Sequence, residues 1–157
     1  MSRRLEVVQR LLRDALDAAP AGPIRLISMC AGDGRDVLGV LPSHRRSADV
    51  SATLVELDPQ LAENARASAT AARLNNLDVV VADAGSTDVY AGSVPAHIAL
   101  VCGVFGNIAD SDVRRTVMTL PCLCAPLATV IWTRGTFEPD LTPRIREWFA
   151  GAGFEEI

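Results

Sequence analysis

The stretch IRLISMCAGDGRD, residues 24–36, decides the fold. It opens as an apolar run, breaks at a glycine-containing turn over residues 30–34, and continues with helix-like apolar spacing over residues 37–41. A buried strand that leads through a tight glycine turn into a helix is typical of nucleotide-binding sites in doubly wound α/β folds. Gly32 and Gly34 carry no Cβ, so the backbone there can approach a ligand closely. The free amides of the following helix favour anionic or electron-rich groups.

Outside this stretch, apolar runs alternate with amphipathic or alanine-rich segments. Strands and helices that alternate at this spacing predict a three-layer, doubly wound, mostly parallel α/β sandwich, with right-handed crossovers that place helices on both faces. Gly153 and Phe154 resemble the start of a sixth, edge strand, so we expect the C-terminal strands to be truncated. The expected helices are 4–18, a short one that ends near 41–42, 59–73, one from 110 closed by Pro121, and 142–151; the expected strands are 24–29, 50–56, 78–82, 96–102 and 127–133.

Length and composition set further limits. The 157 residues suffice for one domain, residues 1–157, with a core over 24–157. No apolar run approaches the roughly 20 residues of a membrane span, and the N-terminal helix mixes charges with leucines, unlike a secretory signal. We therefore expect a cytoplasmic protein with no membrane segment. The net charge of −4 argues against a general attraction to nucleic acid.

The basic and sulfur-containing residues exclude several chemistries. Every basic side chain apart from the two histidines is an arginine, so lysine-dependent chemistry such as Schiff-base formation is excluded. The cysteines form no C-x-x-C pair, and neither histidine is close to one in sequence, so we predict no metal site. Small buried hydrophobic residues in a reducing compartment are the preferred interpretation of these thiols. The residues concerned are Cys30, Cys102, Cys122, Cys124, His44 and His97.

In an open parallel sheet, ligands bind beyond the carboxyl ends of the strands. Glu56 follows Gly34 by 22 residues, the usual interval at which a carboxylate binds the hydroxyl pair of a ribose. Asp83, one strand further out, is placed to accept a hydrogen bond from an adenine amino group. Asp58 and Pro59 are a typical helix start. The candidate site residues are Cys30, Ala31, Gly32, Asp33 and Gly34 after the first strand, Glu56 and Leu57 after the second, Asp83 and Ala84 after the third, and Cys102 and Gly103 after the fourth.

Two other functions stay open on these residues. An NAD(P)-dependent oxidoreductase needs the fingerprint G-x-G-x-x-G, but Val37 stands at its third glycine position, and no Tyr-x-x-x-Lys arrangement is present. A P-loop is excluded because the G-K-[ST] signature is missing. The second alternative is a non-catalytic binding or assembly module. An uncovered sheet edge in such a module would favour pairing, and hence a homodimer.

Taken together, the four strand-end segments resemble those of class I S-adenosyl-L-methionine-dependent methyltransferases, over residues 24–157. The resemblance implies a methyltransferase with S-adenosyl-L-methionine as cofactor. Residues 30–34 would form its glycine motif, Glu56 would bind the ribose, and Leu57 would cover the adenine. Residues 83–84 would line the adenine edge, and residues 102–103 would lie at the methyl-transfer site.

The chain also departs from the family pattern. Cys30 stands where the first motif glycine is common, and Ser28 stands where the family often has an acid, so Asp33 or a backbone carbonyl would hold the methionine amino group. The fourth segment lacks the N-P-P-Y signature, so a small-molecule acceptor is expected and no nucleic-acid substrate is indicated. No catalytic base is evident. We expect Asn107 and Arg134 to border the acceptor pocket as solvated surface residues, Cys102 to be a packing residue, and Trp132 to belong to the core.

Overall fold

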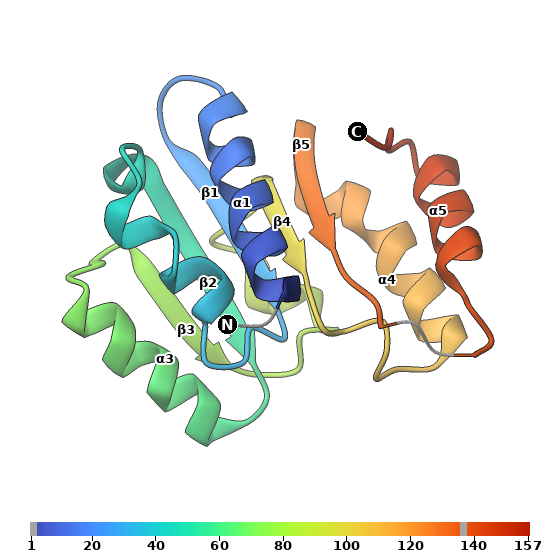
Figure 1. Ribbon diagram of the computed structural model, residues 1–157, viewed down its shortest axis with the longest axis horizontal. Coiled ribbons are helices and arrows are strands. Elements are labelled where there is room, and N and C mark those ends of the chain that lie inside the picture. The colour runs from blue at the N-terminus through green and yellow to red at the C-terminus, as the bar shows by residue number, and fades with distance from the viewer. Residues whose placement is uncertain (1–2, 136–137) are drawn as a thin grey trace.

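In the computed structural model, which describes residues 3–135 and 138–157, five parallel strands lie between two layers of helices (Figure 1). The three-layer α/β prediction is therefore confirmed. Three 3₁₀ turns, Leu41–Ser43, Ser47–Asp49 and Thr87–Tyr90, complete the connections. The strands are β1 (Ile24–Met29), β2 (Val50–Glu56), β3 (Leu77–Val81), β4 (Ala96–Val101) and β5 (Cys124–Trp132); the helices are α1 (Arg3–Ala18), α2 (Arg35–Leu38), α3 (Pro59–Ala71), α4 (Asp110–Leu123) and α5 (Thr142–Gly151).

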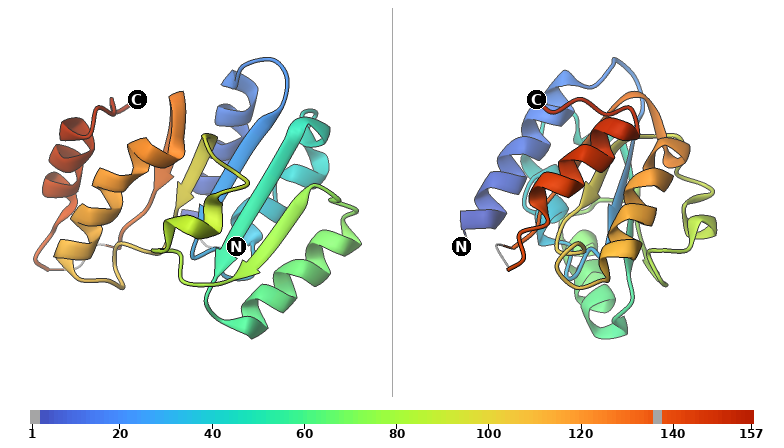
Figure 2. Two further views of the ribbon diagram at one scale, coloured as in Figure 1. Left: turned by 180° about the vertical axis from the view of Figure 1, so that it is seen from behind. Right: turned by 90° about the vertical axis from the view of Figure 1, so that its right-hand side faces the viewer.

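The strand order is β3-β2-β1-β4-β5, and every neighbouring pair is parallel. The chain first adds strands on one side of β1 and then crosses to the other side, so the order reverses between β1 and β4. Seen from behind in Figure 2, all strands point the same way, and their carboxyl ends share one edge of the sheet. That edge, at the reversal point, is where ligands bind in folds of this kind.

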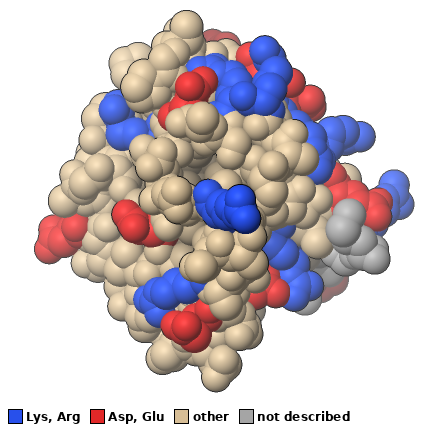
Figure 3. All heavy atoms as spheres, turned by 90° about the vertical axis from the view of Figure 1, so that its left-hand side faces the viewer, with Lys and Arg blue, Asp and Glu red and all other residues tan. Residues whose placement is uncertain are grey.

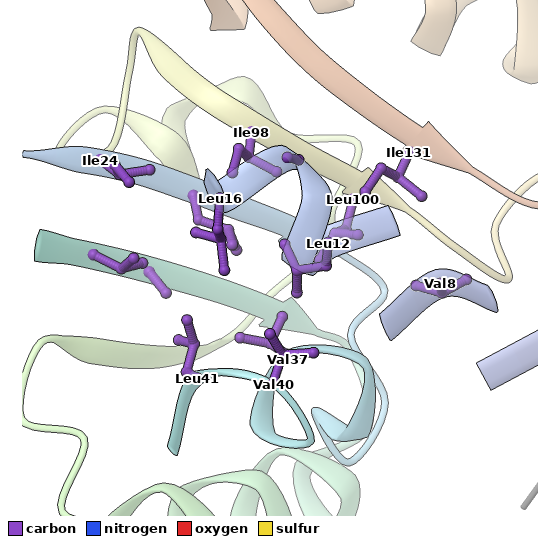
Figure 4. Packing of buried hydrophobic residues seen from close by; sticks show 14 of the residues in the cluster. Val8, Leu12, Leu16, Ile24, Val37, Val40, Leu41, Ile98, Leu100 and Ile131 are labelled. Carbon is purple, nitrogen blue, oxygen red and sulfur yellow. The ribbon is translucent and has the colours of Figure 1, made fainter. Parts of the chain in front are cut away.

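One face of the sheet is covered by α1, α2 and α3. Three residues of α1, spaced four apart, are almost fully buried: Val8, Leu12 and Leu16. They point toward apolar side chains of β1, β4 and β5, and the short α2 segment packs beside them (Figure 4). Because each of these side chains is almost wholly removed from water, their burial stabilises the fold by roughly 1.5–3 kcal/mol per residue.

The opposite face is covered by α4 and α5. A cluster of aromatic rings packs α5 against the sheet: the Phe105 and Trp132 rings lie 5.9 Å apart, and the Trp132 and Phe149 rings stack at 5.6 Å. Strands buried on both faces read as continuous apolar runs, which explains why their positions could be predicted. Trp132 is half-buried in this group, as its predicted core position implies.

The prediction of a sixth strand at Gly153 and Phe154 was wrong, because the structure has no strand there. Instead, Gly153 adopts φ +90° at the end of α5, and the Phe154 amide donates to the Phe149 carbonyl at 3.0 Å. The Gly153 amide donates to the Ala150 carbonyl at 3.0 Å, which completes a Schellman cap. The Phe154 ring meets Phe149 edge-on at 5.6 Å. A glycine followed by an apolar residue suits both a strand start and a helix cap, and here contact with α5 decided between them.

Several element ends also differ from expectation. Pro121 does not close α4, which continues to Leu123. The strand β5 starts at Cys124, three residues early, because its pairing with β4 includes a register shift near Ala96 that the sequence does not reveal. The helix after the glycine turn ends at Leu38, and the chain passes on through 3₁₀ turns. The predicted start of α3 is confirmed: the Asp58 carboxylate accepts from the Gln60 and Leu61 amides at 2.8 and 3.2 Å.

None of the helices within the described residues is both long and apolar enough to cross a bilayer.

Candidate functional site

The glycine turn after β1 has an unusual backbone. Cys30, Gly32 and Gly34 all adopt positive φ, at +50°, +59° and +76°. Cys30 occupies the left-handed region despite its side chain, which costs roughly 1–2 kcal/mol. The Ala31 amide donates to the Val55 carbonyl at 2.9 Å, and the Gly34 amide donates to the Ala31 carbonyl at 2.9 Å. The turn is therefore fixed to the end of β2, and it lies at the edge where the strand order reverses.

The two glycines of this turn do different jobs. A Cβ added at Gly32 would meet no atom within 4 Å, so the backbone there borders open space that a ligand could enter. A Cβ at Gly34 would lie 2.9 Å from Leu38 Cδ1 and 3.0 Å from Leu54 Cδ2. Gly34 thus allows α2 to pack against β2. Gly32 is the glycine at which the backbone can approach a ligand closely.

Glu56 connects the end of β2 to this turn. The residue is 9% exposed, and its two carboxylate oxygens accept from the Gly32 amide at 2.7 Å and from the Asp58 amide at 2.9 Å. An ionised carboxylate offers about four acceptor positions, so two backbone donors leave capacity for two hydroxyl groups. Leu57, the next residue, is 67% exposed, an unusual position for a leucine and one that offers an apolar surface beside Glu56.

Residues 83–84 lie at the same edge. Asp83 Oδ1 accepts from the Gly85 amide at 2.8 Å, and the buried Tyr90 hydroxyl donates to the Ala84 carbonyl at 2.9 Å, which fixes the loop. Partial desolvation is the main cause that raises the pKa of the exposed Cys30 thiol, and the negative charges of Glu56 and Asp83 raise it further. The ends of β1, β2 and β3 lie side by side, because the Ala31 amide donates to the Val55 carbonyl at 2.9 Å and the Ala82 amide donates to the Glu56 carbonyl at 3.1 Å.

Asp33 is already engaged with a neighbour. Arg35 Nε lies 2.8 Å from Asp33 Oδ1 and 2.9 Å from Oδ2, and the hydrogen bond to Arg35 is the main cause that lowers the pKa of the Asp33 carboxyl. Both residues are near the surface. A charged ligand group would have to compete with Arg35 for this carboxylate.

A second group of interacting side chains, which the sequence did not reveal, lies beside Gly103 at the same edge of the sheet. Arg4 of α1 has its Nη2 3.6 Å from Asp36 Oδ1 and donates through Nη1 to Thr133 Oγ1 at 3.4 Å. Thr133 Oγ1 also accepts from the Gly103 amide at 3.1 Å. Asp36 Oδ1 is buried without a hydrogen-bond partner among the described residues, and desolvation raises the pKa of this carboxyl although Arg4 opposes the shift.

The remaining predicted positions have structural contacts. Cys102 is buried, its Sγ lies 3.7 Å from the Ile131 carbonyl, and burial raises the pKa of the thiol to about 12. It therefore stays protonated near neutral pH and serves as a packing residue, as expected. Asn107 donates to the Gly103 carbonyl at 2.6 Å and so braces the loop after β4. His97 lies at the opposite end of β4, where Nδ1 accepts from the Arg25 amide at 3.0 Å.

No group of three or more histidine, cysteine, aspartate or glutamate side chains within residues 3–135 and 138–157 is arranged to hold a metal ion. Surface hollows lie elsewhere, one between α4 and α5 and one beside α3. The face over α3 mixes acidic and basic side chains with broad uncharged areas (Figure 3). This face carries no continuous basic surface of the kind that tracks a nucleic-acid backbone.

No protein-family model and no curated protein matches the sequence. Among solved structures, the chain is similar to an O-methyltransferase family protein from Burkholderia thailandensis, at 17% identity and TM-score 0.75, over 97% of this chain and 50% of that chain. It is also similar to a SAM-dependent methyltransferase from Agrobacterium tumefaciens, at 14% identity and TM-score 0.75, with the same coverage. A third is an RNA methyltransferase from Salinibacter ruber in complex with S-adenosyl-L-homocysteine, at 22% identity and TM-score 0.61, over 89% of this chain and 82% of that chain.

These likenesses, at low identity, establish the fold: it is the Rossmann-like fold of the class I S-adenosyl-L-methionine-dependent methyltransferases. The chain spans about half the length of the first two of these proteins.

Proposed function

We propose that this chain is an S-adenosyl-L-methionine-dependent methyltransferase that transfers the sulfonium methyl to a small-molecule acceptor. One observation carries the proposal. The open backbone at Gly32, the Glu56 carboxylate bonded to it, and the Asp83 loop lie at the sheet edge where folds of this class bind ligands. The methyltransferase fold of the neighbours supports the same assignment.

The residues present fit an adenosyl group. Glu56 has acceptor capacity left for the ribose hydroxyls, and Leu57 offers an exposed apolar surface for one face of the adenine. The Asp83 carboxylate, in the loop that Tyr90 fixes through Ala84, would accept a hydrogen bond from the adenine amino group. The open side of Gly32 lets the backbone reach the sugar without a clash.

The cofactor's methionine tail is a zwitterion, and it needs one cationic and one anionic partner. Arg4 and Asp36 supply such a pair, since their charged atoms lie 3.6 Å apart beside the glycine turn. The buried Asp36 Oδ1 still lacks a hydrogen bond in the described structure, so an ammonium group would satisfy it. This pair fits the tail better than Asp33, whose carboxylate is already bonded to Arg35.

When bound, the cofactor supplies an electrophilic methyl group, and the protein contributes orientation and electrostatics. Glu56 and the Arg4–Asp36 pair would fix the two ends of the cofactor. Gly103, held by Thr133 and Asn107, would border the reacting carbon on the β4 side. The buried Cys102 thiol keeps its proton and stays out of the reaction.

Calorimetric titration with S-adenosyl-L-homocysteine tests the proposal. Glu56→Gln keeps the shape of the side chain but removes its charge, and we expect it to weaken binding at least about tenfold, equal to about 1.4 kcal/mol. Glu63→Gln is the matched control, because Glu63 is an exposed glutamate of α3 that forms an ion pair with its neighbour Arg66. No heat at millimolar ligand with folded wild-type protein would count against the function. Equal affinity of Glu56→Gln and wild type would remove Glu56 from the site.

The charge of the protein is the reason for proposing a small-molecule acceptor rather than a nucleic acid. The chain is acidic overall, with a net charge of −4, and the face over α3 mixes both signs (Figure 3). One structural neighbour is an RNA methyltransferase, so total RNA is the informative comparison. With radiolabelled S-adenosyl-L-methionine, label is expected in a low-molecular-weight extract. Incorporation into RNA alone would overturn this part of the proposal.

A further inference from the structure

Arg134 follows the end of β5, at the same edge of the sheet as the candidate site. It is half-buried, and its Nε and Nη1 atoms are shielded from solvent, yet neither has a hydrogen-bond partner among the described residues. The expectation of a solvated surface arginine is therefore wrong for these two atoms. A guanidinium removed from water without acceptors is unfavourable, so this arrangement needs an explanation.

Another arginine of this chain shows how the fold satisfies a structural guanidinium. The Arg46 side chain is 12% exposed, and it ion-pairs with Asp49 Oδ2 at 3.0 Å. It also donates to four carbonyl oxygens, at 2.8 to 3.4 Å, and so ties the end of α1 to the start of β1: Leu16, Ala19, Pro20 and Gly22. Arg46 is a structural residue by these contacts. Two nitrogens of Arg134 are enclosed, but neither has a hydrogen-bond partner in the described part of the chain.

The neighbours of Arg134 that the structure describes do not supply the missing acceptor. Thr133 is already bonded to Arg4 and to the Gly103 amide. Asp140 is exposed, and its Oδ1 accepts from the Thr142 amide at 3.0 Å. That bond to Thr142 is the main cause that lowers the pKa of the Asp140 carboxyl, ahead of the charge of Arg134. The charge of Arg134 therefore affects the pKa of Asp140 from a distance, but the two side chains form no ion pair within the described residues.

We propose that Arg134 binds an oxyanion, a carboxylate or a phosphate, carried by the methyl acceptor. The identity of the ligand as the acceptor rests on the proposed function; the oxyanion site itself does not. An oxyanion is the partner that a guanidinium binds best, because several N–H donors can converge on its oxygens. The position also suits an acceptor, since Arg134 directly follows Thr133, which holds Gly103.

Thermal unfolding of two matched variants separates a binding role from a structural one. Arg46→Met removes a guanidinium with five partners, and we expect its Tm to fall by several degrees. Arg134→Met removes one whose two enclosed nitrogens have none, so its Tm is expected to stay within about 1 °C of wild type or to rise, because a buried charge without a partner no longer has to be desolvated. A fall in Arg134→Met as large as that in Arg46→Met would mean that Arg134 is structural, and it would overturn the proposal.

NMR of arginine Nε–Hε groups tests binding directly. The Arg134 signal is assigned as the one lost in Arg134→Gln, and Arg114, an exposed arginine of α4, is the control. In protein saturated with S-adenosyl-L-homocysteine, we expect acetate or inorganic phosphate to shift the Arg134 signal saturably, and neutral acetamide to leave it unchanged. A response to acetate alone identifies a carboxylate site, and a response to phosphate alone identifies a phosphate site. No saturable response to either anion, or the same response at Arg114, would refute the site.

A further arm separates the two possible sources of the anion. If acetate shifts the Arg134 signal in the free protein but not in the S-adenosyl-L-homocysteine complex, the cofactor's own carboxylate occupies the site and the acceptor assignment is wrong. If S-adenosyl-L-homocysteine does not bind at all while acetate still does, the proposed function fails and the oxyanion site stands.

Discussion

The contrast between Gly32 and Gly34 gives the sharpest mutational prediction. Both residues have positive φ, so alanine at either position costs roughly 1–2 kcal/mol of backbone strain. At Gly34 the new Cβ would also lie 2.9 Å from Leu38 Cδ1 and 3.0 Å from Leu54 Cδ2. Leu54 is fully buried and cannot move aside, so overpacking adds about 1–3 kcal/mol. We expect Gly34→Ala to lose about 2–5 kcal/mol in all, and Gly32→Ala only the strain term.

Urea unfolding followed by tryptophan fluorescence measures both losses, since the midpoint reports stability when the slope is unchanged. For a domain of this size, each kcal/mol corresponds to about 2–4 °C in Tm. Calorimetry with S-adenosyl-L-homocysteine measures the effect on binding. Gly32→Ala should lose affinity for this ligand, because its Cβ would enter the open space beside the turn. Equal destabilisation of the two variants, or unchanged affinity in Gly32→Ala, would refute the division of roles between the glycines.

Two other predictions concern single carboxylates. Asp58→Ala removes the cap of α3, which accepts from the Gln60 and Leu61 amides, and should cost about 1 kcal/mol in urea unfolding, whereas Asp88→Ala, in the exposed turn before β4, should cost much less. Asp36 has its pKa raised by desolvation, so the folded state binds its proton more tightly than the unfolded state, and stability falls as pH rises from the ordinary pKa of 3.8 through the raised value. Asp36→Asn should therefore be more stable than wild type at pH 7 and converge with it below about pH 4; a constant difference between the two proteins across that range would contradict the shift.

Much of the fold could be predicted because strands buried on both faces leave clear ends. The predicted bounds of β1 and β2 match the structure, since the glycine turn of residues 30–34 ends the first apolar run and the charged Glu56 and Asp58 end the second. Predictions failed where two structures share one local pattern. Gly153 and Phe154 suit a strand start and a helix cap equally well, and only the packing of Phe154 on Phe149 distinguishes them.

The candidate site could be predicted only in part. Glu56 and Asp83 could be predicted as site residues because each lies at or just after the carboxyl end of a strand, and parallel strands end at one edge of the sheet. The bond from the Gly32 amide to Glu56 depends on how two strand ends approach each other, which no local pattern encodes. The contact of Arg4 with Asp36 depends on the path of α1 across the sheet and is equally invisible in the sequence. The binding roles of these residues stay predictions.

The most direct test of the central claim is an amide NMR footprint of S-adenosyl-L-homocysteine on the uniformly labelled protein. If the strand ends form one adenosyl site, the largest shifts will fall together on Gly32, Leu57 and Ala84, at the ends of three different strands. Binding that leaves those amides unchanged and instead shifts residues between α4 and α5, such as Arg114 and Trp148, would contradict the claim, as would the absence of any shift at millimolar ligand.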